Sequence, residues 1–165
     1  MEERVLFVED EEATCATIGR YLRNEGCSCL TAKSGEESLH YFYRDKFSMI
    51  TSGIHMPEMN GIDLLKQAKR LNPHTMVIII TTYLKIPAVD RETVQSGACD
   101  LISEPADLDL LAFSVERGFE KKRLEEEFET YHAYLEGFVD AKTTEFQPAL
   151  LILWSFSFRS TQRPF

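Results

Sequence analysis

The segment Val5–Glu12 has the sequence VLFVEDEE, in which four consecutive apolar residues precede four consecutive carboxylates. A short, continuous apolar run is typical of a β-strand that is buried on both faces, as in a parallel sheet. The acidic cluster begins where that strand would end. The segment therefore predicts a buried parallel strand whose carboxyl end carries acidic side chains.

Four further apolar runs follow along the chain, and amphipathic segments separate them. We expect the further strands at residues 28–31, 49–52, 76–80 and 101–102. In most of the intervening segments, apolar residues recur three or four positions apart, which is the spacing of a helix with one buried face. Residues 88–96 predict a weaker helix without a strong apolar stripe. Ser34 and Glu37 form a capping-box pattern at the start of the second helix. Five strands alternating with five helices predict an α/β fold, a doubly wound five-stranded parallel sheet with helices on both faces.

The residues that follow the strands are the candidates for function, because the crevice of a doubly wound sheet lies at the carboxyl ends of its strands. These residues are Glu9-Asp10, Gly53, Thr81-Thr82 and Glu104-Pro105. They form no glycine-rich phosphate cradle, and no nucleophile stands beside a base. A binding module is therefore favoured, and an enzyme or small-ligand binder on the same frame is the alternative from another class.

These segments together resemble the receiver domain of two-component response regulators, over about residues 4–120. The resemblance rests on VEDE at 8–11, IHMPEMNG at 54–61, TTY at 81–83, GA at 97–98 and Pro105. Each motif alone is weak, but in this order and at these spacings they are specific for the family. The resemblance implies a flavodoxin-like (βα)5 fold with strand order 2-1-3-4-5. It also implies a histidine kinase or an effector protein as partner.

The resemblance implies roles for several residues at the strand ends. Glu9 and Asp10 match the acidic pair that holds a Mg²⁺ ion in the family, and the backbone carbonyl of His55 is a candidate further ligand. Thr81 matches the hydroxyl switch residue of receivers, and Tyr83 matches the aromatic residue that changes rotamer in their active state.

Two positions depart from the family's pattern, and both concern phosphoryl transfer. Gly53 occupies the position of the phosphate-accepting aspartate, and Glu104 occupies that of the phosphate-binding lysine, before the matching Pro105. Glycine offers no nucleophile and one metal ligand fewer, and a glutamate opposes an anionic phosphoryl group. Ser52 is a poor substitute because successive strand residues face opposite ways. We therefore expect a phosphorylation-independent receiver.

The acidic pocket leaves one alternative within signalling. Glu9, Asp10 and Glu104 would be like-charged carboxylates without a basic partner, and such a group either raises its own pKa values or binds a cation. We therefore expect weak Mg²⁺ binding and no other cofactor. A receiver that still switches, through a divalent metal or a non-standard acceptor, is the alternative.

The overall charge and the N-terminus exclude several classes of partner and location. A formal net charge of −9 at pH 7 argues against direct nucleic-acid binding, which needs a basic surface, and against an anionic membrane. The first four residues lack the basic start and apolar run of a signal peptide, so we expect a cytoplasmic protein. The spacing of the four cysteines does not match a zinc site.

The residues beyond the receiver-like segment form two further regions. In residues 121–145 the apolar side chains recur at spacings of four, three, four and three, the heptad pattern of a coiled coil. These seam residues are Leu124, Phe128, Tyr131, Leu135 and Phe138. A parallel homodimer is favoured over a helix folded back on its own domain, although two heptads alone pair only marginally.

The final apolar segment, residues 146–165, has no clear periodicity and is shorter than a membrane span, which needs about 20 apolar residues. We interpret it as an unstructured or non-native tail, with an interaction peptide and an interfacial anchor as alternatives. The expected domains are thus 1–120, 121–145 and 146–165.

Overall fold

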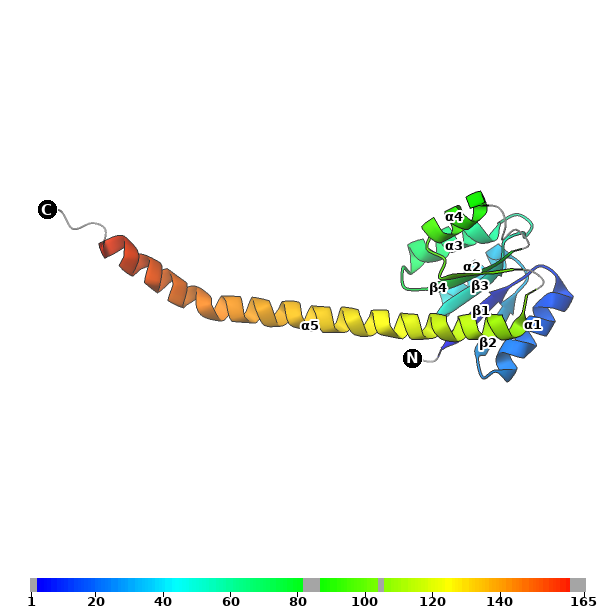
Figure 1. The fold of residues 1–165 in the computed structure, drawn as a ribbon, viewed down its shortest axis with the longest axis horizontal. Helices are drawn as coiled ribbons and strands as arrows, with labels where there is room; N and C mark the ends of the chain where they lie inside the picture. Colours follow the sequence, from blue (N-terminus) through cyan, green and yellow to red (C-terminus); the bar gives the residue numbers. More distant parts are fainter. Residues whose placement is uncertain (1–2, 82–86, 104–105, 161–165) are drawn as a thin grey trace. The chain divides into compact units, whose positions relative to one another are not determined.

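The computed structural model describes the backbone of residues 3–81, 87–103 and 106–160, and the side chains of these ranges except 87–90 and 145–160. One sheet of five parallel strands has the order β2-β1-β3-β4-β5. The strands are β1 (Arg4–Val8), β2 (Ser28–Ala32), β3 (Met49–Gly53), β4 (Met76–Thr81) and β5 (Asp100–Ser103). The helices are α1 (Glu12–Asn24), α2 (Gly35–Arg44), α3 (Gly61–Leu71), α4 (Pro87–Gln95) and α5 (Leu108–Ser160). The predicted α/β fold and strand order are confirmed (Figure 1).

The sheet is buried on both faces because its strands send alternate side chains into two separate cores. In β1, Leu6 and Val8 pack into the core that α2 and α3 cover. Val5 and Phe7 pack into the core that α1 and the first turns of α5 cover. An ion pair of 2.8 Å between Lys66 and Glu92 joins α3 to α4, which lies beside it in Figure 1. The uninterrupted apolar run that opened the sequence follows from this two-sided burial.

The chain divides into two compact units, Met1–Arg123 and Leu124–Phe165. The expected boundaries at 120 and 145 remain predictions. The backbone of residues 146–160 is helical and belongs to α5, so the interpretation of this stretch as unstructured is wrong as far as Ser160. Three leucines, Leu150, Leu151 and Leu153, are strong helix formers and lie within this continuation of the preceding helix. Within the described residues, no helix combines the length and hydropathy needed to cross a bilayer.

The connection from β3 to α3 folds tightly back against the end of β3. Gly61, the first residue of α3, donates its N–H to the carbonyl of Ile54 at 2.9 Å. A Cβ atom at Gly61 would overlap the carbonyl oxygen of Gly53, which is backbone and therefore not easily displaced. Glycine at position 61 is thus required by close packing. Asn60 caps the helix, since its side chain accepts the N–H of Asp63 at 2.9 Å.

We predict that Gly61→Ala lowers the free energy of unfolding by about 1–3 kcal/mol, because the added methyl group forces the backbone apart. Urea denaturation followed by circular dichroism measures this change. Gly137→Ala is the matched control, since a Cβ there meets no atom within 4 Å. It should leave stability unchanged or raise it by up to about 1 kcal/mol. Equal stability of the two variants would contradict the packing argument.

Candidate functional site

The carboxyl ends of β1, β3 and β4 bring Glu9, Gly53 and Thr81 to one edge of the sheet. Glu9 directly follows β1 and is only 9% exposed. Its backbone N–H donates to the carbonyl of Ala32 at 3.1 Å, which ties it to the end of β2. Its carboxylate accepts the N–H of Glu11 at 3.3 Å. Thr81, the last residue of β4, is 1% exposed. The structure therefore places the predicted site residues Glu9 and Thr81 at buried strand ends.

Gly53 stands directly beside the carboxylate of Glu9. A Cβ atom built at position 53 would lie 3.1 Å from Oε2 of Glu9, its nearest neighbour. The backbone of Gly53 is not in the positive-φ region, which among the described glycines holds only Gly26 and Gly97. The strand geometry therefore does not require glycine here. A side chain at position 53 would point at Glu9 and would need only a small movement of that carboxylate.

Ser52 is buried on the opposite side of β3, as its neighbouring position on the strand predicts. Its hydroxyl group donates to the carbonyl of Gly53 at 2.9 Å and lies 3.8 Å from the sulfur of Met56. The side chain is fully buried. Ser52 is therefore inaccessible as a substitute acceptor at this edge.

The other residues predicted for the pocket are either exposed or outside the described part of the chain. Asp10 and His55 are exposed. Tyr83, Glu104 and Pro105 lie outside the described residues, so their expected roles stay predictions.

The described residues do not fit a firmly bound Mg²⁺ ion. Among them, no three His, Cys, Asp or Glu side chains are grouped closely enough to hold a metal. Glu9 and Asp10 supply two carboxylates, whereas position 53 supplies none. A hard cation such as Mg²⁺ is bound through carboxylate and other oxygen ligands, so the loss of one carboxylate weakens the site.

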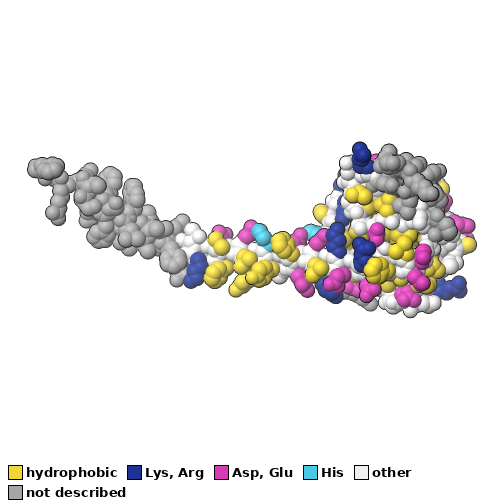
Figure 2. All heavy atoms as spheres, in the orientation of Figure 1, with side chains coloured by type: hydrophobic (Ala, Val, Ile, Leu, Met, Phe, Trp, Pro, Cys, Tyr) yellow, Lys and Arg dark blue, Asp and Glu magenta, His cyan; other side chains and the backbone are white. Residues whose placement is uncertain are grey.

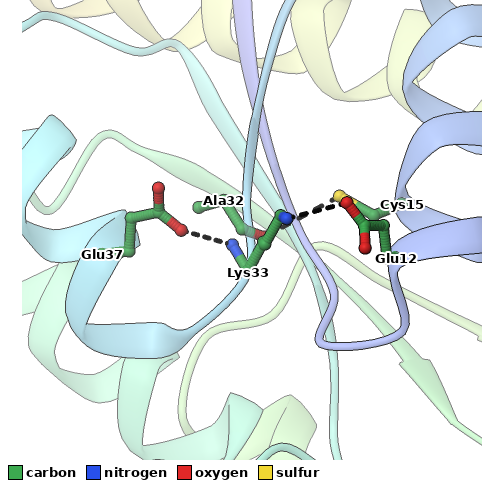
Figure 3. Close-up of polar contacts among 5 residues, drawn as sticks. All are labelled: Glu12, Cys15, Ala32, Lys33 and Glu37. Carbon is green, nitrogen blue, oxygen red and sulfur yellow. Dashed lines mark hydrogen bonds and ion pairs between the residues drawn. The ribbon is translucent and has the colours of Figure 1, made fainter.

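A polar cluster that the sequence interpretation missed connects three elements at the same end of the sheet (Figure 3). Lys33, which follows β2, donates its ammonium group to Glu12 of α1 at 2.9 Å. Its backbone N–H donates to Glu37 of α2 at 2.6 Å, and the Glu37 N–H donates to Ser34 at 3.1 Å. The predicted cap by Ser34 is thus confirmed, whereas Glu37 accepts the N–H of Lys33, one residue before the cap. Lys33 holds the pKa of the Glu12 carboxyl group below its ordinary value. The position of Lys33 directly after a strand was the signal that could have found it.

Comparison with known proteins identifies the family of this chain. Residues 5–116 match the response regulator receiver domain family. The chain belongs to this family, and this segment is a receiver domain of the kind found in two-component response regulators. The receiver domain of the Francisella response regulator 1452 has a TM-score of 0.67 at 26% identity, and the match covers 72% of this chain and 98% of that one.

Curated relatives share the same segment. The transcriptional regulatory protein GlrR of Escherichia coli is 32% identical over 117 residues, which are 71% of this chain and 26% of GlrR. A cyclic di-GMP phosphodiesterase of Thermotoga maritima is 30% identical over 111 residues, which are 67% of this chain and 29% of that protein. The chain thus matches somewhat more than a quarter of the length of each relative. The similarity is therefore limited to this segment and does not extend to the rest of either relative.

We predict that Gly53→Asp restores a responsive cation site, because it adds a third carboxylate next to Glu9. Without metal, this variant should be about 1 kcal/mol less stable than Gly53→Asn, since two like charges meet at close range. Millimolar Mg²⁺ should raise its melting temperature more than that of the neutral Asn variant or of the natural chain, which we expect to bind Mg²⁺ only weakly.

Thermal melts with and without MgCl2, together with calorimetric titration, measure both effects. Gly53→Asn is the matched control because its side chain has nearly the same shape and no charge. The same response to Mg²⁺ in the Asp and Asn variants would show that Glu9 and position 53 do not act together on a cation.

Proposed function

We propose that this receiver domain signals by protein–protein contact, independently of phosphorylation. One observation carries the proposal. The end of β3 presents Gly53 to the carboxylate of Glu9, so the place where an aspartate would accept phosphate in the family holds no nucleophile. Ser52, the nearest hydroxyl along the strand, is buried on the other side.

The charges around this edge support the same proposal. Formation of an acyl phosphate requires cations that neutralise the transferred phosphoryl group. Here Glu9 is followed by Asp10, Glu11 and Glu12. The ammonium group of Lys33 is engaged by Glu12 at 2.9 Å. An approaching phosphoryl group would therefore meet carboxylates, which disfavours its attack and its binding.

We predict that incubation with acetyl phosphate and Mg²⁺ leaves the mass of the natural chain unchanged. Addition of beryllofluoride should likewise leave the spectroscopic signals of the natural chain unchanged. The double variant Gly53→Asp with Glu104→Lys should regain labelling, because it supplies a nucleophile and a phosphate-binding cation. Intact-mass spectrometry detects the adduct.

The control for this experiment is Gly53→Asn with Glu104→Lys, which has the same added lysine but no carboxylate at position 53. It should stay unlabelled. A phosphoryl adduct that peptide mapping places on the natural chain would overturn the proposal.

The contact surface that we propose lies on α5. The seam residues are unusually exposed for aromatic and aliphatic side chains, and Figure 2 shows hydrophobic side chains gathered along the described part of this helix. Their exposed fractions are 54% for Leu124, 69% for Phe128, 63% for Tyr131, 42% for Leu135 and 52% for Phe138. A row of exposed apolar side chains with heptad spacing favours burial against another helix. A second copy of this chain offers the same row, so we propose a parallel homodimer.

We predict that Leu135→Lys weakens self-association at least tenfold, because it places a charge inside the helix pair, where an ion is costly. Sedimentation equilibrium measures the dissociation constant. Ala133→Lys is the matched control, since it adds the same charge to the same helix at a position away from the seam.

The control variant should associate like the natural chain. Two other outcomes would contradict the homodimer. One is a natural chain that sediments as a monomer at all concentrations, and the other is equal dimerisation of the two variants. A monomer whose seam is protected from hydrogen exchange would instead indicate a helix folded back on its own domain.

A further inference from the structure

We infer that the seam of α5 specifies an in-register parallel pair and that this pair is tightened at mildly acidic pH by contacts between Glu127 and His132 of the two copies. This inference rests on the proposed homodimer and adds its register, its orienting charges and its regulation. It is carried by the positions of apolar, lysine and charged side chains along one exposed helix.

The orientation follows from what each arrangement places opposite the seam. In a parallel pair in register, each of the five seam residues packs against the same residue of the other copy. The seam alternates between the first and the fourth position of the heptad. In an antiparallel pair, a first-position residue of one copy packs against a fourth-position residue of the other. One such register sets Phe138 opposite Lys121, and the next sets Leu124 opposite Lys142. The parallel register sets the five apolar residues against one another, and it places Lys121 and Lys142 opposite their own counterparts just beyond the two ends of this row.

The residues beside the seam favour the same register. With Phe128 and Leu135 at the first heptad position, Glu127 immediately precedes the seam and His132 lies five residues further on. In a parallel coiled coil these two positions of opposite chains face each other across the seam. Glu127 of each copy therefore meets His132 of the other, and symmetry produces two such contacts in each dimer. Both side chains are exposed in the single chain and so are accessible for this pairing.

The neighbouring heptads differ from this one. Toward the start of the seam, the corresponding residues are Glu120 and Glu125, two like charges that disfavour pairing. Toward its end they are Tyr134 and Val139, which are 67% and 59% exposed and widen the apolar face. The Glu127–His132 contact thus lies between a repulsive and an apolar part of the seam.

The pH dependence has a definite sign. An imidazole ordinarily gains its proton at about pH 6.5, and only the protonated form attracts a carboxylate. On its own helix His132 faces Glu136, whose carboxylate lies 3.5 Å away, and Glu129, and its ring lies 6.0 Å from that of Phe128. These neighbours are present with or without a partner, whereas Glu127 of the other copy is gained only on pairing. Protonation of the imidazole therefore favours association, and the gain is lost as the pH rises.

Sedimentation equilibrium of the full chain at pH 6.0 and pH 8.0 in low salt tests the inference. We expect association about fivefold tighter at pH 6.0, the effect of two exposed ion pairs, with most of the difference removed by 0.5 M NaCl. His132→Gln and Glu127→Gln should each abolish this difference.

Two controls separate the contact from general effects of pH. His40→Gln removes an exposed histidine of α2 and should retain the full difference, as should Glu136→Gln, which removes only the neighbour on the same helix. Exchange of the pair, Glu127→Lys with His132→Glu, should keep association tight at both pH values. If the His132→Gln variant keeps the pH difference of the natural chain, the inference is wrong.

Cross-linking tests the register separately. Leu124→Cys should form a disulfide-linked dimer on mild oxidation, because a parallel pair sets this position against itself. In the antiparallel registers its counterpart is residue 135 or 142, at least 11 residues away, or roughly 16 Å along a helix. Ala133→Cys, on the outer side of the helix, is the control and should not cross-link.

A dimer that cross-links at neither position would overturn the parallel register while leaving the homodimer intact. A chain that stays monomeric at both pH values would overturn the homodimer itself. Neither result bears on phosphorylation independence, which acetyl phosphate labelling decides.

Discussion

The burial of a parallel sheet on both faces is the constraint on which the rest of this structure depends. Every residue of β3 and β4 is buried, and alternate side chains of β1 enter two different cores. Polar chemistry in such a sheet is confined to the strand ends. Glu9, Thr81 and Gly53 therefore lie at the same edge of the sheet, because the strands that carry them are parallel and buried.

The same packing separates the fold of the domain from its phosphorylation chemistry. Gly53 has an ordinary strand conformation, and the carbonyl group of this residue packs against Gly61. The side-chain direction, in contrast, points at Glu9. The hydrogen bonds and close contacts that shape the β3–α3 connection therefore involve backbone atoms that any residue at position 53 would supply. An acceptor can be absent here while the backbone contacts between β3 and α3 stay in place.

The sequence predicted the fold well because its strongest signals are local and periodic. The apolar runs of β1 and β4 and the cap at Ser34 each specify their own element, and the burial of Ser52 followed from strand alternation. The pairing of Lys33 with Glu12 was missed because it joins residues 21 positions apart through a turn geometry that no periodicity encodes. The helical state of residues 146–160 was missed because a segment without an apolar stripe has no amphipathic signal, and its Pro148 and its many Phe and Ser residues do not favour helix.

The double role of Gly53 has a consequence for how such a domain could change over time. Its carbonyl oxygen packs against Gly61 and helps to shape the fold, whereas a side chain at position 53 would face the carboxylate of Glu9. Substitutions at this residue and at Glu104, the two positions that depart from the family's pattern, would then change the phosphorylation chemistry without rebuilding the backbone contacts of the β3–α3 connection. Position 53 is thus a place where the chemistry of such a domain can be exchanged in the course of evolution while its frame stays the same.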